Sequence, residues 1–188
     1  MNAPMPMVTI FKTIDISNLI KLKKKGYKLN MLMCYCIGLA ANDIDEFKLL
    51  PVAKKMIQYN NIGINVIVLN QYGSLSTCDI PFKDDLNEFN DLYLKLVDQV
   101  YQTGDSYEIT DHMIIGTSSL IKYDFDGLIN MYSGIYNNPM LFWGKYFQEN
   151  ETMKLKISFQ FHHVQMDGIE ACEFLEKLQN YINNLTVD

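Results

Sequence analysis

Two hydrophobic patterns follow one another along the chain: short runs of alternating apolar and polar residues, and longer runs in which apolar residues recur every three or four positions. The first pattern is typical of β-strands and the second of amphipathic helices. Turn residues such as Asn60-Asn61 separate the alternating runs, which predict strands. The predicted strands cover residues 8–12, 47–50, 55–59, 65–70, 75–80, 112–119, 140–148 and 154–161.

Four segments carry the helical pattern, whereas residues 121–136 fit neither pattern. In the first, Asp15 is suited to cap the N-terminus and Gly26 to end the helix. Strands and helices do not alternate regularly, and there is no glycine-rich phosphate loop, which argues against a doubly wound dinucleotide-binding fold. We expect an α/β protein with helices packed on one large mixed β-sheet, a two-layer sandwich, formed by a single domain over residues 1–188. The predicted helices cover residues 16–25, 29–42, 84–100 and 166–184.

Composition allows a substantial core but does not favour nucleic acid as a partner. Hydrophobic residues make up 48% of the 188 residues, and the net charge is -6. Binding to phosphate backbones requires a basic surface, so no nucleic-acid partner is expected. All 16 basic residues are lysines, which excludes the bidentate clamps that arginine forms on carboxylates and phosphates.

The four cysteines have no zinc-site spacing, and the N-terminal residues lack the basic and apolar regions of a secretory signal. The longest apolar run, residues 31–41, is too short to span a bilayer. We therefore expect a cytoplasmic protein with no membrane association.

The most informative segment is residues 154–168, which end in His162-His163-Val164-Gln165-Met166-Asp167-Gly168. Strict alternation places Leu155 to Phe161 at every second position on one apolar face. Continued by one step, the same period places His163 on the apolar side and His162 on the polar side. Burial disfavours the imidazolium ion, so a buried His163 would be neutral and able to act as a general base.

Each of these residues also has an ordinary structural interpretation. A histidine on an apolar face is commonly a packed core residue, and Asp167 with Glu170 three positions later reads as a capping box at a helix start. His162, His163 and Asp167 are residue types that bind metals, but the two histidines are expected on opposite faces of a strand, so no metal site is predicted.

The segment His162 to Gly168 resembles the HHxxxDG signature of coenzyme A-dependent acyltransferases, and the chloramphenicol acetyltransferases are the most similar in size and flanking sequence. Gly144-Lys145-Tyr146, with Pro139 before it, resembles a GKY segment of that family. Asp45-Glu46-Phe47 resembles its PEF segment, and residues 173–179 resemble the helix after the signature. The resemblance extends from about residue 8 to the C-terminus.

The resemblance implies a homotrimer with active sites between subunits. His163 would be the general base that lets a hydroxyl of a small acceptor alcohol, chloramphenicol or a similar compound, attack acetyl-CoA directly, which would confer antibiotic resistance. Asp167, His162 and Gly168 would be structural at the site. Lys145, Tyr146 and Lys28 would meet the coenzyme, although the two lysines can also be read as solvated surface charges.

Three departures from the family pattern leave a second hypothesis open. The chain begins near the family's second strand, the arginine that pairs with the signature aspartate is absent, and Asp124 or Phe125 stands where the family has a serine that stabilises the oxyanion. Ser118, Ser119 and Tyr123 are the nearby hydroxyl groups. The alternatives are therefore a truncated, non-catalytic relative that keeps the fold and the oligomer surface, or an acyltransferase acting on another alcohol, an amine or a protein-bound thiol.

Overall fold

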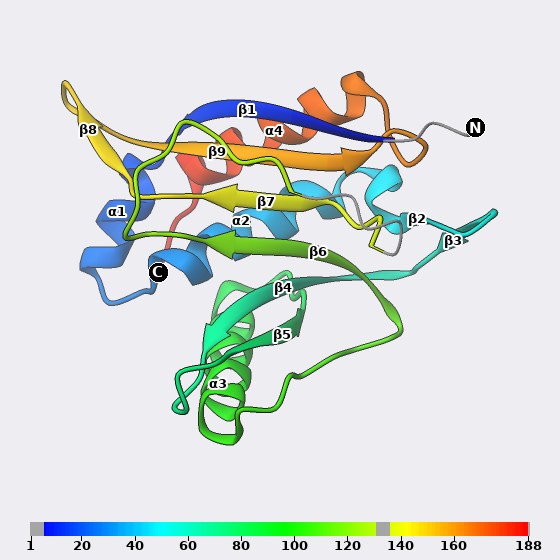
Figure 1. The fold of residues 1–188 in the computed structure, drawn as a ribbon. Coiled ribbons are helices and arrows are strands. Elements are labelled where there is room, and N and C mark those ends of the chain that lie inside the picture. Colours follow the sequence, from blue (N-terminus) through cyan, green and yellow to red (C-terminus); the bar gives the residue numbers. More distant parts are fainter. Residues whose placement is uncertain (1–5, 131–135, 188) are drawn as a thin grey trace.

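The computed structural model describes residues 6–130 and 136–187 (Figure 1). None of the helices in this described part has the length and apolar character that crossing a lipid bilayer requires. The strands are β1 (Met7–Asp15), β2 (Leu49–Val52), β3 (Lys55–Gln58), β4 (Asn61–Leu69), β5 (Leu75–Pro81), β6 (His112–Ser119), β7 (Met140–Trp143), β8 (Phe147–Glu149) and β9 (Thr152–His162). The helices are α1 (Ser17–Lys24), α2 (Leu29–Asn42), the 3₁₀-helix η1 (Asp45–Lys48), α3 (Leu86–Thr103) and α4 (Gly168–Asn184).

One seven-stranded mixed sheet dominates the fold. Its strand order is β1-β9-β7-β6-β4-β5, with β8 paired to β9, while β2 and β3 form a separate hairpin. The pairs β4–β6 and β6–β7 are parallel and the remaining pairs are antiparallel. Helices α1, α2 and α4 lie behind one face of the sheet, and α3 packs on β4 and β5 (Figure 1). The expected two-layer α/β architecture is confirmed.

Helix α2 forms the middle of the core. Its bounds, Leu29–Asn42, coincide with the predicted ones, and ten of its fourteen residues are buried. A helix that is apolar on most sides must be covered on most sides. Three aromatic rings join β9, η1 and α4 at one end of this core: the ring centroid of Phe174 lies 4.7 Å from that of Phe47 and 4.8 Å from that of Phe159. This cluster fixes the position of the segment that joins β9 to α4.

Two predicted strands differ in the structure. Residues 45–48 form a 3₁₀-helix, and extended structure begins only at Leu49. The predicted strand over residues 140–148 divides into β7 and β8 because the chain leaves the sheet at Gly144. Beyond that glycine, the Lys145 N–H donates to the Tyr123 carbonyl at 2.8 Å, so the neighbouring backbone partner is a loop instead of a strand.

The second face of β9 is buried, which the alternating pattern did not predict. Residues 120–130 cross over this face in front of the sheet (Figure 1). The Leu128 N–H donates to Ser158 Oγ at 2.9 Å, and Gln160 Nε2 donates to the Asn130 carbonyl at 3.3 Å. Ser158 is fully buried and Gln160 is 3% exposed. Of the segment 121–136, for which no element was predicted, residues 131–135 lie outside the described residues.

Candidate active site

The histidine pair lies where β9 ends, and the two rings have environments opposite to those predicted. His162 is the last residue of β9, and the chain turns at once, with the Gln165 N–H donating to the His162 carbonyl at 2.8 Å. His162 is buried, with 7% of the residue exposed, whereas the His163 side chain is 54% exposed. The prediction that His163 lies on the apolar side of a strand is therefore wrong. Strand β9 ends at His162, so the alternation of the two faces does not continue to His163. Its role as a base stays a prediction.

His163 has one charged neighbour within the described part of the chain. Its Nδ1 lies 3.1 Å from Oδ1 of Asp167, whose side chain is 71% exposed. A carboxylate beside Nδ1 favours the tautomer with hydrogen on that nitrogen, which leaves the Nε2 lone pair available to take up a proton. The Asp167 N–H also donates to the Glu170 carboxylate at 3.0 Å, as in the expected capping box. Because Asp167 is exposed and lies beside His163, the absence of an arginine leaves no unpaired buried charge at this position.

His162 is held as a neutral structural group. Burial, and to a lesser extent the proximity of His163, lowers the pKa of its imidazole below the ordinary value of 6.5. Its Nδ1 accepts a hydrogen bond from the Val164 N–H at 3.1 Å. That nitrogen is thereby occupied within the turn and is not directed toward a site shared with His163. In the described residues, no three His, Cys, Asp or Glu side chains come together as a metal ion would require.

Gln165, which the sequence reasoning did not single out, is the buried centre of the turn. It is 4% exposed, and its Nε2 donates to the carbonyls of Leu49 at 2.7 Å and Glu46 at 3.2 Å. The side chain therefore ties the histidine turn to η1 and β2. The feature of the sequence that could have indicated this role is the uncharged amide of Gln165 within the signature. An amide can donate hydrogen bonds to buried carbonyls, which an apolar side chain cannot.

The predicted coenzyme residues occupy two separate places. Lys145 is exposed just beyond β7, and the Tyr146 hydroxyl lies 3.4 Å from Lys23 Nζ, which sits 5.3 Å from the centre of the Tyr146 ring. Lys23 was not predicted at this position and adds a second cation beside Tyr146. Lys28 lies elsewhere, at the start of α2, where it lines a pocket.

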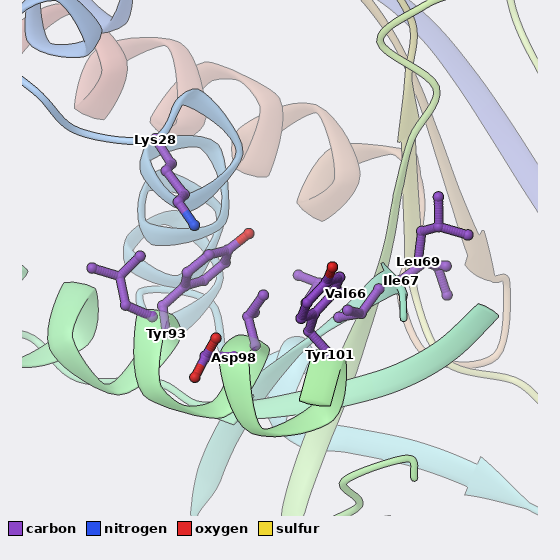
Figure 2. Close-up of a pocket in the computed structure, with 10 residues that line it drawn as sticks. Lys28, Val66, Ile67, Leu69, Tyr93, Asp98 and Tyr101 are labelled. Carbon is purple, nitrogen blue, oxygen red and sulfur yellow. The ribbon is translucent and has the colours of Figure 1, made fainter. Parts of the chain in front are cut away.

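The pocket that contains Lys28 has a volume of about 410 Å³ and lies between α3 and the end of β4 (Figure 2). Lys28 extends toward Tyr93 of α3, and Asp98 and Tyr101 also lie on α3 (Figure 2). Asn30 Nδ2 donates to the Tyr93 hydroxyl at 2.9 Å, which holds this ring against α2. The pocket combines one cation, one carboxylate and two phenol groups with apolar walls from Val66, Ile67, Val68, Leu69, Leu94 and Val97.

The sheet divides beside this pocket. Strand β4 pairs with β6 only as far as Asn65, opposite Gly116; beyond that point β4 pairs with β5, and β6 pairs with β7. Thr117 marks the division, since its Oγ1 donates to the Asn65 carbonyl at 2.7 Å. Residues 66–69, which line the pocket, therefore have no partner strand on the β6 side within the described sheet.

The pocket and His163 lie toward opposite ends of the sheet. Asn65, Gly116, Met140 and Gln160 form one row across four neighbouring strands. The pocket residues lie beyond this row in one direction and His163 lies beyond it in the other. At about 3.3 Å per residue and about 4.8 Å per strand, they are roughly 25 Å apart within one chain.

The two residues considered for the oxyanion position are engaged elsewhere. The Asp124 carboxylate lies 3.4 Å from Lys156 Nζ, which also contacts Asp126 at 2.7 Å. The Phe125 ring packs so closely on Gly144 that a Cβ there would lie 2.8 Å from the ring. Neither residue presents a hydrogen-bond donor from its side chain.

Comparison with known proteins decides the family. The sequence profile described as "CAT: Chloramphenicol acetyltransferase" matches residues 7–179. The chain belongs to the chloramphenicol acetyltransferase family. Chloramphenicol acetyltransferase 3 from Escherichia coli is 26% identical in an alignment of 179 residues that covers 91% of this chain and 83% of that protein.

Solved structures agree with the fold. A chloramphenicol acetyltransferase structure has a TM-score of 0.84 at 20% identity and covers 94% of this chain and 88% of that chain. The cubic core of the pyruvate dehydrogenase multienzyme complex has a TM-score of 0.72 at 18% identity, covering 96% of this chain and 83% of that chain. The chloramphenicol acetyltransferase family is one of acyltransferases that use acetyl-CoA as co-substrate, so the resemblance inferred from the signature is confirmed at the level of the family.

Proposed function

We propose that the protein is an acetyltransferase that moves an acetyl group from acetyl-CoA to a hydroxyl of a small acceptor, chloramphenicol or a similar alcohol, with His163 as the general base. The observation that carries the proposal is the position of His163 at the end of β9, with Asp167 3.1 Å from its Nδ1. This arrangement leaves Nε2 as the nitrogen that takes the proton.

In the proposed reaction, Nε2 of His163 removes the proton from the acceptor hydroxyl while the hydroxyl oxygen attacks the thioester carbonyl. The tetrahedral intermediate then collapses, the bond from carbon to sulfur breaks, and an acetyl ester forms. The proton on His163 passes to the departing coenzyme A thiolate. No covalent acyl-enzyme is required, and the resident groups of the chain act only on the proton and on substrate position.

A second copy of the chain is part of this proposal, because His163 is too exposed to act alone as a shielded base. Exclusion of water strengthens electrostatic interactions at a reacting centre, and 54% of the His163 side chain is open in the single chain. Val164 and Ile169, which follow His163 in the chain, are 46% and 78% exposed, which suits burial against a partner. We assign that role to neighbouring copies in a homotrimer, with the acceptor held between subunits.

The coenzyme is proposed to bind at the end of the sheet that carries Lys28, Lys145 and Tyr146. Lys28 would attract a phosphate, and the pocket beside it offers apolar walls and the backbone edge of residues 66–69. The amides of an extended pantetheine arm can pair with such an edge. This pocket and His163 of the same chain are roughly 25 Å apart. The distance favours an arrangement in which the thioester held by one subunit meets His163 of a neighbouring subunit.

The decisive experiment measures thioester cleavage from acetyl-CoA in the presence of chloramphenicol, for the wild type and for His163→Ala. The proposal expects turnover to fall by about 10²–10⁴-fold when the base is removed. Equal rates in the two proteins would exclude this mechanism. A disulfide reagent would also react with exposed Cys172, so the thioester absorbance is the preferred signal.

Complementation tests the subunit arrangement. His163→Ala and Lys28→Glu chains are purified separately and then mixed under conditions that exchange subunits. If the base and the coenzyme site of one reaction centre come from different chains, mixed oligomers regain turnover that neither variant shows alone. Failure to regain activity would place both groups in the same chain or exclude the oligomer.

The non-catalytic alternative is favoured by one observation, the absence of a side-chain donor at Asp124 and Phe125. Loss of one oxyanion donor costs about 10²–10³ in kcat, so a weak enzyme and a non-enzyme must be distinguished by binding. Calorimetry with coenzyme A separates them, since the non-catalytic hypothesis expects no heat of binding.

A further inference from the structure

We infer that Gln165 is a positioning residue that sets the direction of the His163 imidazole by clamping the turn between β9 and α4 to η1 and β2. This inference rests on the proposed function of His163 for its catalytic consequence. The clamp is the pair of hydrogen bonds from Gln165 Nε2 to the carbonyls of Leu49 and Glu46, at 2.7 and 3.2 Å.

Gln165 is the side chain by which the turn is tied to a distant segment of the chain. The backbone of the turn makes three further hydrogen bonds: the His163 N–H donates to the Pro6 carbonyl at 2.8 Å, and the N–H groups of Gln165 and Met166 donate to the nearby His162 carbonyl at 2.8 and 3.4 Å. The Glu46 and Leu49 carbonyls are separated from Gln165 by more than 110 positions in the sequence, so the amide fixes the turn relative to the core.

The donors of the amide, not its volume, explain its presence. Gln165 is 4% exposed, and within the described residues its Oε1 is buried with no hydrogen-bond partner. An unsatisfied buried acceptor is unfavourable, and an apolar side chain of the same length would fill the space without it. The side chain is therefore suited to hold two carbonyls at this point.

The direction of the His163 ring depends on this turn because packing within the chain does not hold it. More than half of the side chain is exposed, and Asp167, its charged neighbour, is itself 71% exposed. Both residues flank Gln165 in the turn, one on each side. A shift of the turn would move the imidazole and the carboxylate together, and a misplacement of about 1 Å at a reacting group can cost about 10²-fold in rate.

The test compares Gln165→Met, which keeps the length and removes both donors, with Gln179→Met. Gln179 is a matched control toward the other end of α4: its Oε1 accepts from the Asp15 N–H and its Nε2 donates to the Asp15 carbonyl, both at 2.9 Å. Both variants lose a long-range amide clamp and should lose thermal stability. Only Gln165→Met should lower kcat, by about 10–100-fold, with the KM values for acetyl-CoA and acceptor changed less than about twofold.

A second measurement does not depend on turnover. The ¹⁵N chemical shifts of the His163 ring report its tautomer, which Asp167 biases toward hydrogen on Nδ1. Gln165→Met should shift this equilibrium and Gln179→Met should not. An unchanged tautomer together with an unchanged kcat in Gln165→Met would overturn the inference, as would a change confined to KM. Should Gln165→Met not fold, Gln165→Asn, which keeps the amide but shortens its reach to the two carbonyls by one methylene, is measured in the same way.

The inference and the proposed function fail separately. A wild-type protein with no turnover removes the proposed function, and the ring tautomer then decides alone whether Gln165 orients His163. An active wild type with an unaffected Gln165→Met variant keeps the function and removes the positioning role.

Discussion

Replacement of Gly144 by alanine tests whether the loop over the sheet is locked to the end of β7. A Cβ at this position would lie 2.6 Å from the Tyr123 carbonyl oxygen and 2.8 Å from the Phe125 ring, where ordinary contact begins at 3.4 Å. The loop would have to retreat by about 0.8 Å to reach that ordinary contact, which weakens the 2.8 Å hydrogen bond from the Lys145 N–H to the same carbonyl. Overpacking costs about 1–3 kcal/mol and a lost hydrogen bond about 1 kcal/mol, so Gly144→Ala should destabilise the protein by about 2–4 kcal/mol.

The assay is urea unfolding followed by circular dichroism, with wild type and variants at one chain concentration because self-association contributes to apparent stability. Gly168→Ala is the matched control. A Cβ added at this signature glycine would have no heavy atom within 4 Å, and the residue has no positive φ, so alanine should leave the free energy of unfolding unchanged or raise it slightly. A Gly144→Ala protein within about 0.5 kcal/mol of the wild type, a change typical of ordinary surface positions, would refute the close approach of the loop to β7.

Three further outcomes follow from burial. Burial lowers the pKa of His162 in the folded protein, so His162 of the unfolded chain takes up its proton first as the pH falls through about 6.5. The free energy of unfolding should therefore decline from pH 7 to pH 5. His162→Asn should flatten that decline in urea titrations at each pH. Phe174→Ala should cost about 3–5 kcal/mol by the same unfolding assay, because its fully buried ring packs on β9 and η1. Of the four cysteines, Cys172 is exposed and burial raises the pKa of Cys34 to about 12; a thiol reagent should therefore modify one cysteine rapidly in the native protein and four after denaturation.

The hydrophobic pattern predicted the elements well wherever it is bounded by polar or turn residues at both ends. The bounds of α2 and β6 coincide with the predicted residues 29–42 and 112–119. Periodicity failed where backbone pairing changes without a change of pattern. Residues 140–148 read as one extended run, yet the chain leaves the sheet at Gly144 and the Lys145 N–H donates to the Tyr123 carbonyl, a partner that no local pattern specifies.

The roles assigned to the signature residues stay predictions, and the environment expected for His163 was wrong. The signature identified His163 and Asp167, and the structure brings their side chains within 3.1 Å. The pattern could not show that β9 ends one residue before His163, because a strand end depends on the turn that follows. Gln165 holds that turn by donating hydrogen bonds to carbonyls more than 110 positions away in the sequence. A local sequence pattern does not reveal such long-range hydrogen bonds.

The exposure of His163 and the position of the Lys28 pocket lead to the same conclusion from independent observations. A general base works best where water is excluded, yet in one chain the imidazole of His163 stands largely in the open. A thioester held near Lys28 would lie roughly 25 Å from that imidazole, at the other end of the sheet. On the proposed function, one chain would carry the base and the coenzyme site at opposite ends of the sheet, and closed assembly of identical chains is the simplest way for the base of one copy to meet the coenzyme held by the next. The chemistry of this protein is on that account expected to depend on chain concentration, and specific activity should fall when dilution separates the subunits.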